Sequence, residues 1–563
     1  MSGFFQEPPV LGNQFTEDRL LCAYLKRILP EDVWLAVKPQ LNRFGARVIG
    51  DILEMAQAAE KEEPTLEQFD AWGNRYDRIL VSNGWKDLDR VSAEEGLVAM
   101  GYERTYGSWS RVCQFAKLYL FNPSSAVYTC PLAMSDGAAR LIEVLGDDRL
   151  KNTAFKHLTS RDPYQFWTSG QWMTERSGGS DVGGTETVAH LVDGVYRLYG
   201  DKWFTSATTA QMAMTLARIE SSGTSIPGSK GLSLFYLETH REDGSLNRIR
   251  LHRLKNKLGT RALPTAELSM AGARARLIGQ EGRGIANISV LFNITRIYNA
   301  CSATSFLRRG LALARDYATR RVAFGKALAE HPLYAETLAS LEVELAGAFH
   351  LTFHVTQLLG HVECGEATPE DTAVLRLLTP LVKLYTAKQA IAGISEVLEC
   401  FGGAGYMEDT GLPKLLRDAQ VLSIWEGSTN VLSLDVLRAM KRDQAMLPFF
   451  HALETRLKSI NHPSLDASKE KAAAALDIIE DYATNCAAAE QDYAQGGARS
   501  FAYALAGIQA ASLLLEHAQW SLASGNGERD LILVRRWCEK DLIPLTAVNA
   551  QRREASRLLI SGP

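Results

Sequence analysis

The feature that most constrains the fold is a change of hydrophobic period that occurs twice along the 563 residues. Between about Tyr164 and Ile278 the apolar segments are short and strand-like, and glycine and polar residues separate them. On both sides of this stretch, apolar residues recur at helical spacing. The longest helical segments are residues 285–320, 332–362 and 368–401. We therefore expect a small β-domain, either sandwich or barrel, between an N-terminal helical part and a bundle of antiparallel helices.

The length itself exceeds what one hydrophobic core normally organises, and three or four domains are expected. The fold class predicted from the period is α+β and mostly α. The predicted domains are an N-terminal helical domain (1–163), a β-domain (164–279), a helical bundle (280–443) and an alanine-rich helical C-terminal extension (444–563).

Composition excludes few functions. A formal net charge of −4 gives no reason to expect binding of the whole chain to nucleic acid or to an anionic membrane. The eight cysteines are scattered without metal-ligand spacing, so we expect reduced thiols and no metal site. The N-terminus lacks a basic region followed by an apolar one, and no later run suggests a bilayer crossing, which favours the cytoplasm.

One carboxylate, Glu426, lies between Trp425 and Gly427, just before a segment with the signature of a helix start. Ser428 to Asn430 are N-cap residue types, and apolar residues at helical spacing follow them. A carboxylate between an indole and a glycine can be partly desolvated, which suits a general base. The alternative is that Glu426 only complements the dipole of the following helix.

Two segments of the β-domain have the composition of ligand-binding loops. Residues 172–181, Trp-Met-Thr-Glu-Arg-Ser-Gly-Gly-Ser-Asp, could present backbone N–H groups and hydroxyls to phosphate or carbonyl oxygens, or could be a simple turn. Residues 202–205, Lys-Trp-Phe-Thr, could stack on a planar heterocycle and donate a hydrogen bond to it. The alternative for Trp203 is a place in the core.

Two further segments lie in the predicted bundle. Arg320 and Arg321 precede Phe324 where a long helix ends, and arginine can clamp a pyrophosphate, although basic residues there also offset the helix dipole. The glycines of Phe401-Gly-Gly403 form either a helix C-cap or a surface that a ligand approaches closely.

Taken in order, these segments resemble the acyl-CoA dehydrogenase flavoprotein family over roughly residues 120–440. The resemblance rests on Met173-Thr-Glu with Gly179-Ser-Asp181, Lys202-Trp-Phe-Thr205, Arg321-Val-Ala-Phe-Gly325, Phe401-Gly-Gly403 and Ile424-Trp-Glu-Gly-Ser428. The AidB-like branch is the most similar. That similarity rests on Thr174–Asp181 without a proline after Glu175, on Leu254–Gly259, on the Trp425-Glu-Gly-Ser428 form, on Leu434–Arg438 and on the extension after residue 440.

The resemblance implies an N-terminal helical domain, a middle β-domain and a C-terminal four-helix bundle, with FAD held between them and across a subunit interface. It implies that Met173, Thr174 and Ser180 contact the isoalloxazine, with Trp203 and Thr205 on its other side. The neighbour's FAD would be reached by Arg321 and Phe324. The dinucleotide would pass Gly402, Gly403 and Ser428, and the remaining cofactor-binding positions are Gly179, Phe204 and Asn430.

Glu426 matches the family's catalytic base, which removes a proton α to a carbonyl while hydride passes to flavin N5. Arg438 and Arg296 could tune this base or contact an anion, or could be structural ion-pair members. The substrate would be a small-molecule or carrier-bound acyl group, and the assembly a homo-oligomer, most simply a tetramer. Pro332 and Glu399 depart from the family pattern, so inter-subunit FAD contacts could differ in detail.

Two alternatives stay open from the sequence. The AidB resemblance allows association with DNA, for which the candidate contacts are Arg535, Arg536, Lys540, Arg552, Arg553 and Arg557. The same scaffold also supports flavin oxidases and hydroxylases that react with oxygen, and fold alone does not separate these reactions.

Overall fold

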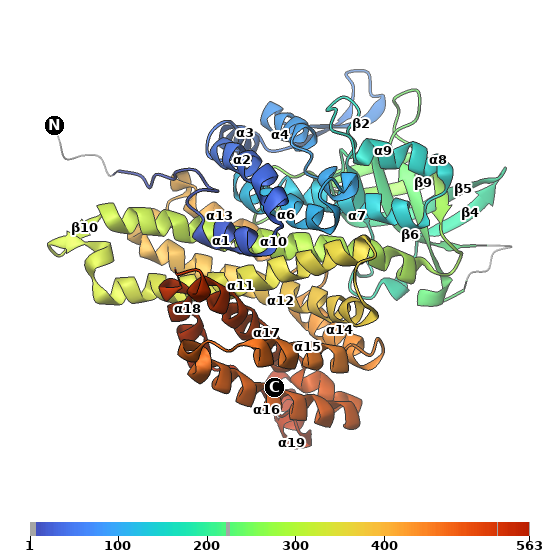
Figure 1. Ribbon diagram of the computed structural model, residues 1–563. Helices are drawn as coiled ribbons and strands as arrows, with labels where there is room; N and C mark the ends of the chain where they lie inside the picture. The colour runs from blue at the N-terminus through green and yellow to red at the C-terminus, as the bar shows by residue number, and fades with distance from the viewer. Residues whose placement is uncertain (1–6, 221–225, 526, 562–563) are drawn as a thin grey trace, which may run out of the picture. The chain divides into compact units, whose positions relative to one another are not determined.

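The computed structural model describes residues 7–220, 226–525 and 527–561 (Figure 1). The first six residues, where the sequence predicts no leader, lie outside this range. The described chain is mostly helical with a middle β-domain, as predicted. It divides into two compact units. One comprises residues 43–105 and 117–298, and the other comprises residues 1–42, 106–116 and 299–563.

In the first unit, helices surround a core next to the β-domain. They are α3 (Asp51–Lys61), α4 (Asn83–Glu94), α5 (Met100–Glu103), α6 (Ser110–Phe121, from residue 117), α7 (Thr129–Leu145), α8 (Asp148–Asn152) and α9 (Ala154–Leu158). The backbone of α7 comes very close to the next long helix, because a Cβ on Gly137 would lie 2.6 Å from Leu291 Cγ. Buried Asp136 of α7 accepts hydrogen bonds from the hydroxyls of Tyr102 (2.7 Å) and Tyr298 (2.8 Å).

The β-domain is a barrel. Its strands are β3 (Ser169–Trp172), β4 (Val188–Val192), β5 (Val195–Ser206), β6 (Met212–Ile219), β7 (Leu232–Glu238), β8 (Ile249–Leu254) and β9 (Thr265–Ile278). Pairing runs β4–β5–β9–β7–β6 and returns from β6 to β4, which closes the ring, while β3 adds to β6 and β8 to β9. Closure leaves β5 and β9 as long central strands, of which β5 carries the Lys202–Thr205 segment.

The N-terminal domain predicted to be helical (1–163) contains a short segment that is not. Strands β1 (Thr65–Phe69) and β2 (Arg75–Leu80) form an antiparallel hairpin there. Its turn contains Gly73 at a φ of 83°, which favours glycine. Gln68 and Arg75 donate side-chain hydrogen bonds to the carbonyl of Leu251 on β8, so the hairpin is stabilised by a partner far away in sequence.

The second unit is built on long helices that match the predicted segments within a residue or two. They are α10 (Gly284–Arg320, from residue 299), α11 (Pro332–Glu363) and α12 (Pro369–Cys400), followed by α13 (Leu412–Leu422) and α14 (Thr429–Lys441). A capping box at Thr368 and Asp371 starts α12. The two-residue strands β10 (Val322–Ala323) and β11 (Lys326–Ala327) form the turn after α10. Helices α1 (Arg19–Ile28) and α2 (Glu31–Arg47, to residue 42) belong to this unit.

The C-terminal extension is helical, as predicted. It consists of α15 (Met446–Ser459), α16 (Asp466–Ala488), α17 (Gln491–Ala523), α18 (Glu528–Glu539) and α19 (Ala550–Ile560). Helix α17 packs against α11, α12 and α14. The sequence predicted no apolar run long enough to cross a membrane. Among the described residues, however, α17 is long enough and apolar enough in composition to do so. Because 78% of its apolar window is buried inside the protein, α17 also has the properties of a long helix in a protein core.

Candidate active site

Glu426 lies in the short turn between α13 and α14, and its backbone is unusual. Its φ is 58°, in the left-handed region that side chains other than glycine rarely adopt, and Gly427 follows at 108°. A Cβ on Gly427 would lie 2.9 Å from Leu432 Cδ2, so a larger residue has little room there. Strained backbone persists only where its surroundings hold it, and it concentrates at functional sites. The half-buried Glu426 carboxyl is therefore presented by a constrained turn.

Two side chains from other helices hold this turn. Lys383, buried inside α12, donates a hydrogen bond from Nζ to the carbonyl of Gly427 at 2.6 Å. Asn299 on α10 donates from Nδ2 to the carbonyl of Trp425 at 3.4 Å. The residues on either side of Glu426 are thus anchored to the bundle. Sequence reasoning missed both anchors, although a lysine inside the apolar run Leu381–Tyr385 is a signal that could have been noticed.

Ser428 is the N-cap residue of α14, as predicted, but its side chain makes no capping hydrogen bond. Its hydroxyl is half-buried, and the side chain of Asn430, two positions further, is exposed. The polar groups at this helix start are therefore not consumed by the helix itself, in keeping with the ligand contact that the resemblance implies.

Arg438 occupies a different setting from the turn. Its Nη1 lies 3.2 Å from Asp435 Oδ1 on the same helix, and Asp435 also pairs with Arg376 at 2.7 Å. The Arg438 side chain is 58% exposed. It belongs to a surface ion-pair cluster on α14. The other predicted arginine, Arg296, is half-buried on α10 in the other unit.

In the first unit, the two predicted β-domain segments lie together. The backbone amide of Trp203 donates to the carbonyl of Thr174 at 3.0 Å. Beside it, Lys202 Nζ lies 2.7 Å from Glu175 Oε1, and both side chains are buried. Burial alone would raise the pKa of the Glu175 carboxyl, but Lys202 and hydrogen bonds from Thr187 and Glu186 hold it below its usual range. This buried ion pair fixes the loop onto β5.

The rest of the loop is open. Ser180 and Gly179 are exposed, while Met173 beneath them is buried. Gly179 has a structural reason, because a Cβ there would lie 2.6 Å from Thr174 Oγ1. Thr174, half-buried, completes a surface of hydroxyls and backbone groups at the end of β3.

On the adjoining strand, Trp203 is half-buried and Phe204 is 54% exposed. Lys255 comes from the Leu254–Gly259 segment, and its Nζ lies 3.8 Å from the Trp203 ring centroid and 4.6 Å from that of Phe204. Thr205 is buried, and its hydroxyl donates to the carbonyl of Ala266 at 2.8 Å. Its donor is therefore used within the sheet.

Arg321 and Phe324, which were predicted to reach a neighbouring subunit, are both exposed to solvent. Phe324 is 99% exposed at a φ of 51°, and Arg321 is exposed beside it. At Gly402 and Gly403 an added Cβ would meet nothing within 4 Å. Gly402 has a φ of 58° just after the end of α12, so a helix C-cap accounts for that glycine. The Phe324 ring contacts His331 edge-on at 6.1 Å between centroids and otherwise faces solvent, which suits contact with a group outside the chain.

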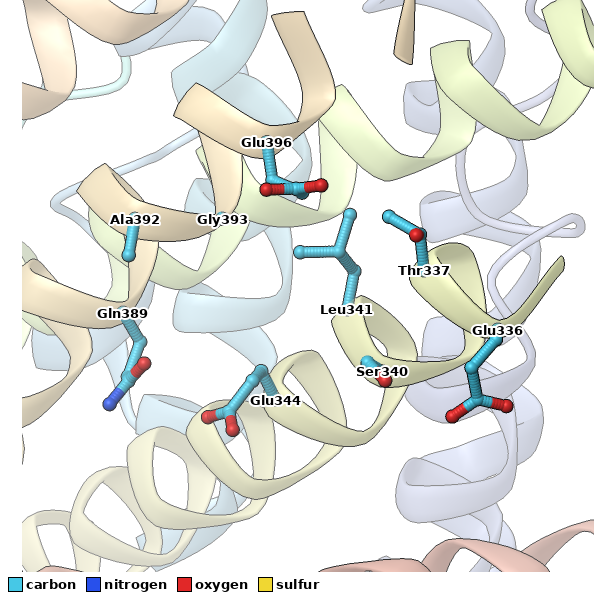
Figure 2. Close-up of a pocket in the computed structure, with 9 residues that line it drawn as sticks. All are labelled: Glu336, Thr337, Ser340, Leu341, Glu344, Gln389, Ala392, Gly393 and Glu396. Atoms are coloured by element: carbon cyan, nitrogen blue, oxygen red, sulfur yellow. The ribbon is translucent and has the colours of Figure 1, made fainter. Parts of the chain in front are cut away.

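A groove of about 400 Å³ between α11 and α12 contains none of the predicted site residues (Figure 2). Three carboxylates, Glu336, Glu344 and Glu396, line it. Two of them are already paired, Glu336 with Arg536 of α18 and Glu344 with Lys540, the residue after α18. The groove is acidic, and basic residues of the same chain already neutralise two of its carboxylates. It is therefore a poor match to an anionic cofactor.

Those pairs also bear on the possible DNA contacts. Besides Arg536 and Lys540, Arg553 lies 3.0 Å from Asp492 and Arg557 lies 3.6 Å from Glu554. Four of the six candidate cations are thus matched by acids of the same chain, which leaves little free basic surface for phosphate contacts. In the described ranges, no group of His, Cys, Asp or Glu could hold a metal ion.

The order of a helical domain, a β-barrel and a helical bundle agrees along the chain with known protein families. Residues 6–163 match the family description "Adaptive response protein AidB N-terminal domain", 170–273 "Acyl-CoA dehydrogenase, middle domain", and 282–441 "Acyl-CoA dehydrogenase, C-terminal domain". Residues 444–559 match "Acyl-CoA dehydrogenase 11 C-terminal domain-like". The chain belongs to the acyl-CoA dehydrogenase family.

Individual relatives are similar over most of their length. Acyl-CoA dehydrogenase family member 11 of Caenorhabditis elegans is 45% identical over 96% of this chain and 90% of its own. The putative acyl-CoA dehydrogenase AidB of Escherichia coli is 30% identical over 78% of this chain and 80% of its own. The crystal structure of Caenorhabditis elegans ACDH-11 in complex with C11-CoA has a TM-score of 0.95 at 44% identity, covering 100% of this chain and 97% of that one.

These findings confirm the predicted family, its AidB-like features and its class of reaction. The protein is an FAD-dependent oxidoreductase of the acyl-CoA dehydrogenase type. The chain has residues that fit this cofactor: open hydroxyls at Thr174 and Ser180, an accessible indole at Trp203, and two glycines with free space around them.

Proposed function

We propose that this protein oxidises the CH–CH bond next to the carbonyl of a CoA thioester, with Glu426 as the general base. The observation that carries this assignment is the left-handed turn at Glu426, which Lys383 and Asn299 hold from two helices. A turn that only started a helix would not need a strained glutamate or a buried ammonium to fix it.

In this reaction Glu426 removes the proton from the α-carbon, and the β-carbon gives up a hydride, so that a C=C bond forms. The bound FAD supplies the hydride acceptor. The chain's part is to hold the carboxylate at a fixed position and to keep the first unit's loop in place through Lys202 and Glu175. General-base catalysis of this kind contributes roughly a hundred- to ten-thousand-fold in rate.

The cofactor contacts are assigned by their settings. Thr174, Gly179 and Ser180 present the loop surface, and Trp203 and Phe204 lie on the strand beside it. The buried Met173 and Thr205 are assigned by the family resemblance alone, since the Thr205 hydroxyl is used within the sheet. A surface at the end of the bundle is formed by Arg321, Phe324, Gly402 and Gly403, which are open to solvent. This exposed surface supports a homo-oligomer in which it contacts a second copy of the chain, most simply in a tetramer. Ser428 and Asn430 are assigned to the cofactor because their side chains are not used by the helix cap.

The acyl group is proposed to be of medium length. The support is the ACDH-11 structure, whose described ligand is C11-CoA and which aligns with this chain over its whole length. Acyl-CoA thioesters that bracket this length are therefore the substrates to assay.

The test is Glu426→Gln, which keeps the shape of the side chain and removes its basicity. Anaerobic stopped-flow reduction with C8- to C14-CoA should fall by at least about a hundredfold, while the flavin spectrum and thermal stability stay close to those of the wild type. Glu370→Gln is the matched control, because Glu370 lies in the first turn of α12 and only complements a helix dipole. Equal reduction rates in both variants and the wild type would refute the assignment.

A further inference from the structure

A second cavity, of about 270 Å³, lies within the helical unit where α1, α11, α15 and α17 meet, and none of the predicted site residues lines it. It is lined mainly by polar side chains, among them Arg27, Arg456, Glu516 and His354. The cavity is unrelated to the Glu426 turn, and its chemistry is independent of the proposed function.

Two guanidinium groups share one carboxylate in this cavity. Arg27 Nη1 lies 2.9 Å from Glu516 Oε2, and Arg456 Nε lies 3.6 Å from Glu516 Oε1. The arginine side chains are only 12% and 14% exposed. Glu516, whose side chain is 39% exposed, is the one acid among the described residues that line the cavity, so the two mostly buried arginines carry an excess positive charge.

The neighbouring histidines add no charge to this group. Burial, together with nearby arginines, lowers the pKa of His354 and His350 well below its ordinary value, so both are neutral at physiological pH. Tyr24 adds the face of its ring, 5.3 Å from the Arg27 guanidinium, but no charge.

Hydrogen-bonding capacity is also left over. Among the residues that the structure describes, Nε of Arg27 is buried and has no hydrogen-bond partner. The same holds for both ring nitrogens of His350, which packs against Tyr24 at 5.5 Å between ring centroids. Arg456 makes one long bond from Nη1 to Ser512 Oγ at 3.2 Å. Buried donors without partners are rare in native proteins, and they indicate a missing acceptor.

We infer that this cavity is a binding site for a small oxyanion, which sits between Arg27 and Arg456 and accepts hydrogen bonds from both. Guanidinium groups bind carboxylate and phosphate oxygens with two parallel N–H donors, which suits this pair. The anion balances the second arginine and uses the free donor of Arg27. Phosphate and a short dicarboxylate share this chemistry, and the cavity volume admits either.

The experiment uses the full FAD-loaded protein in Tris-chloride, titrated by calorimetry with inorganic phosphate or with malonate, against sodium chloride of equal ionic strength. One of the two oxyanions should bind saturably, and the titration that saturates identifies the source. Arg456→Gln should weaken that binding at least tenfold. Arg90→Gln, which removes an exposed arginine paired with Asp87, is the matched control and should leave it unchanged.

A second variant, Glu516→Gln, distinguishes loss of the binding site from misfolding of Arg456→Gln. Removing the competing carboxylate frees both guanidinium groups, so the anion should bind several-fold more tightly, a direction opposite to that of Arg456→Gln. Absence of saturable heat with both anions in the wild type would overturn the inference. Weaker binding to Glu516→Gln would overturn it as well.

Discussion

Lys383 donates a hydrogen bond from Nζ to the carbonyl of Gly427 at 2.6 Å, so an ammonium buried inside α12 holds the residue next to the proposed base. Since Glu426 has a φ of 58°, the turn is in a conformation that costs on the order of 1–3 kcal/mol without outside support. Lys383 is thus a positioning residue for the Glu426 carboxylate.

Lys383→Met removes this support and should lower the rate of flavin reduction by about tenfold to a hundredfold, because a misplacement of about 1 Å has effects of that size. The KM for acyl-CoA should change less than kcat, since the turn positions the base and does not hold the CoA. Lys383→Arg should recover part of the rate. A Met variant that loses stability but reduces its flavin at the normal rate would assign Lys383 a purely structural role.

Lys202→Met tests the ion pair that fixes the loop of the first unit. It leaves the Glu175 carboxylate buried without its cation, which should cost about 3–5 kcal/mol of unfolding free energy. The double variant with Glu175→Gln should recover much of that loss, because no uncompensated charge remains. Denaturant titrations of the wild type, the single variant and the double variant measure the difference, and equal losses in the two variants would contradict a charge effect.

His517 predicts a dependence of stability on pH. Burial, with Arg27 and Arg529 nearby, lowers the pKa of His517 to about 3, whereas an unfolded histidine titrates near 6.5; Asp530 at 3.9 Å does not reverse this. The unfolded chain therefore binds more protons between these values, so the stability contribution is full above pH 6.5 and is lost as pH falls toward 3.

His517→Gln removes that contribution. The loss of unfolding free energy on going from about pH 7 to about pH 5 should be smaller in the variant by about 2 kcal/mol. His451→Gln, at an exposed position on α15, is the control and should retain the wild-type pH dependence. Parallel curves for wild type and His517→Gln would show that this histidine does not titrate on unfolding.

Phe324→Ser tests the proposed contact between copies. Phe324 is 99% exposed, so its replacement should change the stability of an isolated chain by less than about 0.5 kcal/mol. It should nevertheless weaken the oligomer and release FAD, as measured by light scattering and by flavin retained after gel filtration. Leu191→Ser removes another exposed apolar side chain, 60% exposed on β4, and should alter neither. An oligomer that keeps its flavin in Phe324→Ser would place the interface elsewhere.

Much of the fold can be predicted from local sequence. The bundle segment expected at 368–401 is observed as α12 over Pro369–Cys400, because its capping box and its apolar spacing lie within the segment itself. The β1–β2 hairpin could not be predicted in this way. Most residues of its two strands are exposed, and their stabilising partner, Leu251, lies some 180 residues away, where no local pattern reveals it.

The residues of the candidate site also fall into those that the sequence could predict and those that it could not. The motif residues could be found because loops that approach a cofactor concentrate glycine, hydroxyls and aromatic rings within a few positions, as at Gly179 and Trp203. The supports could not, since Lys383 and Asn299 act from single positions on helices, and only the folded chain brings them to the turn. For Arg438, the sequence left a structural ion pair as an alternative, and the structure shows one with Asp435, three residues earlier on the same helix.

The C-terminal extension places the Trp537 ring against Gly347 of α11, where only a glycine leaves room for it. A Cβ on Gly347 of α11 would lie 2.2 Å from the Trp537 ring, and the Trp537 indole also donates to the carbonyl of Gly507 at 3.1 Å. A gap the size of an indole in a buried helix face would be left open if the chain ended near residue 443. The bundle and the extension have therefore become interdependent, so that neither could now be exchanged between relatives as a free-standing module.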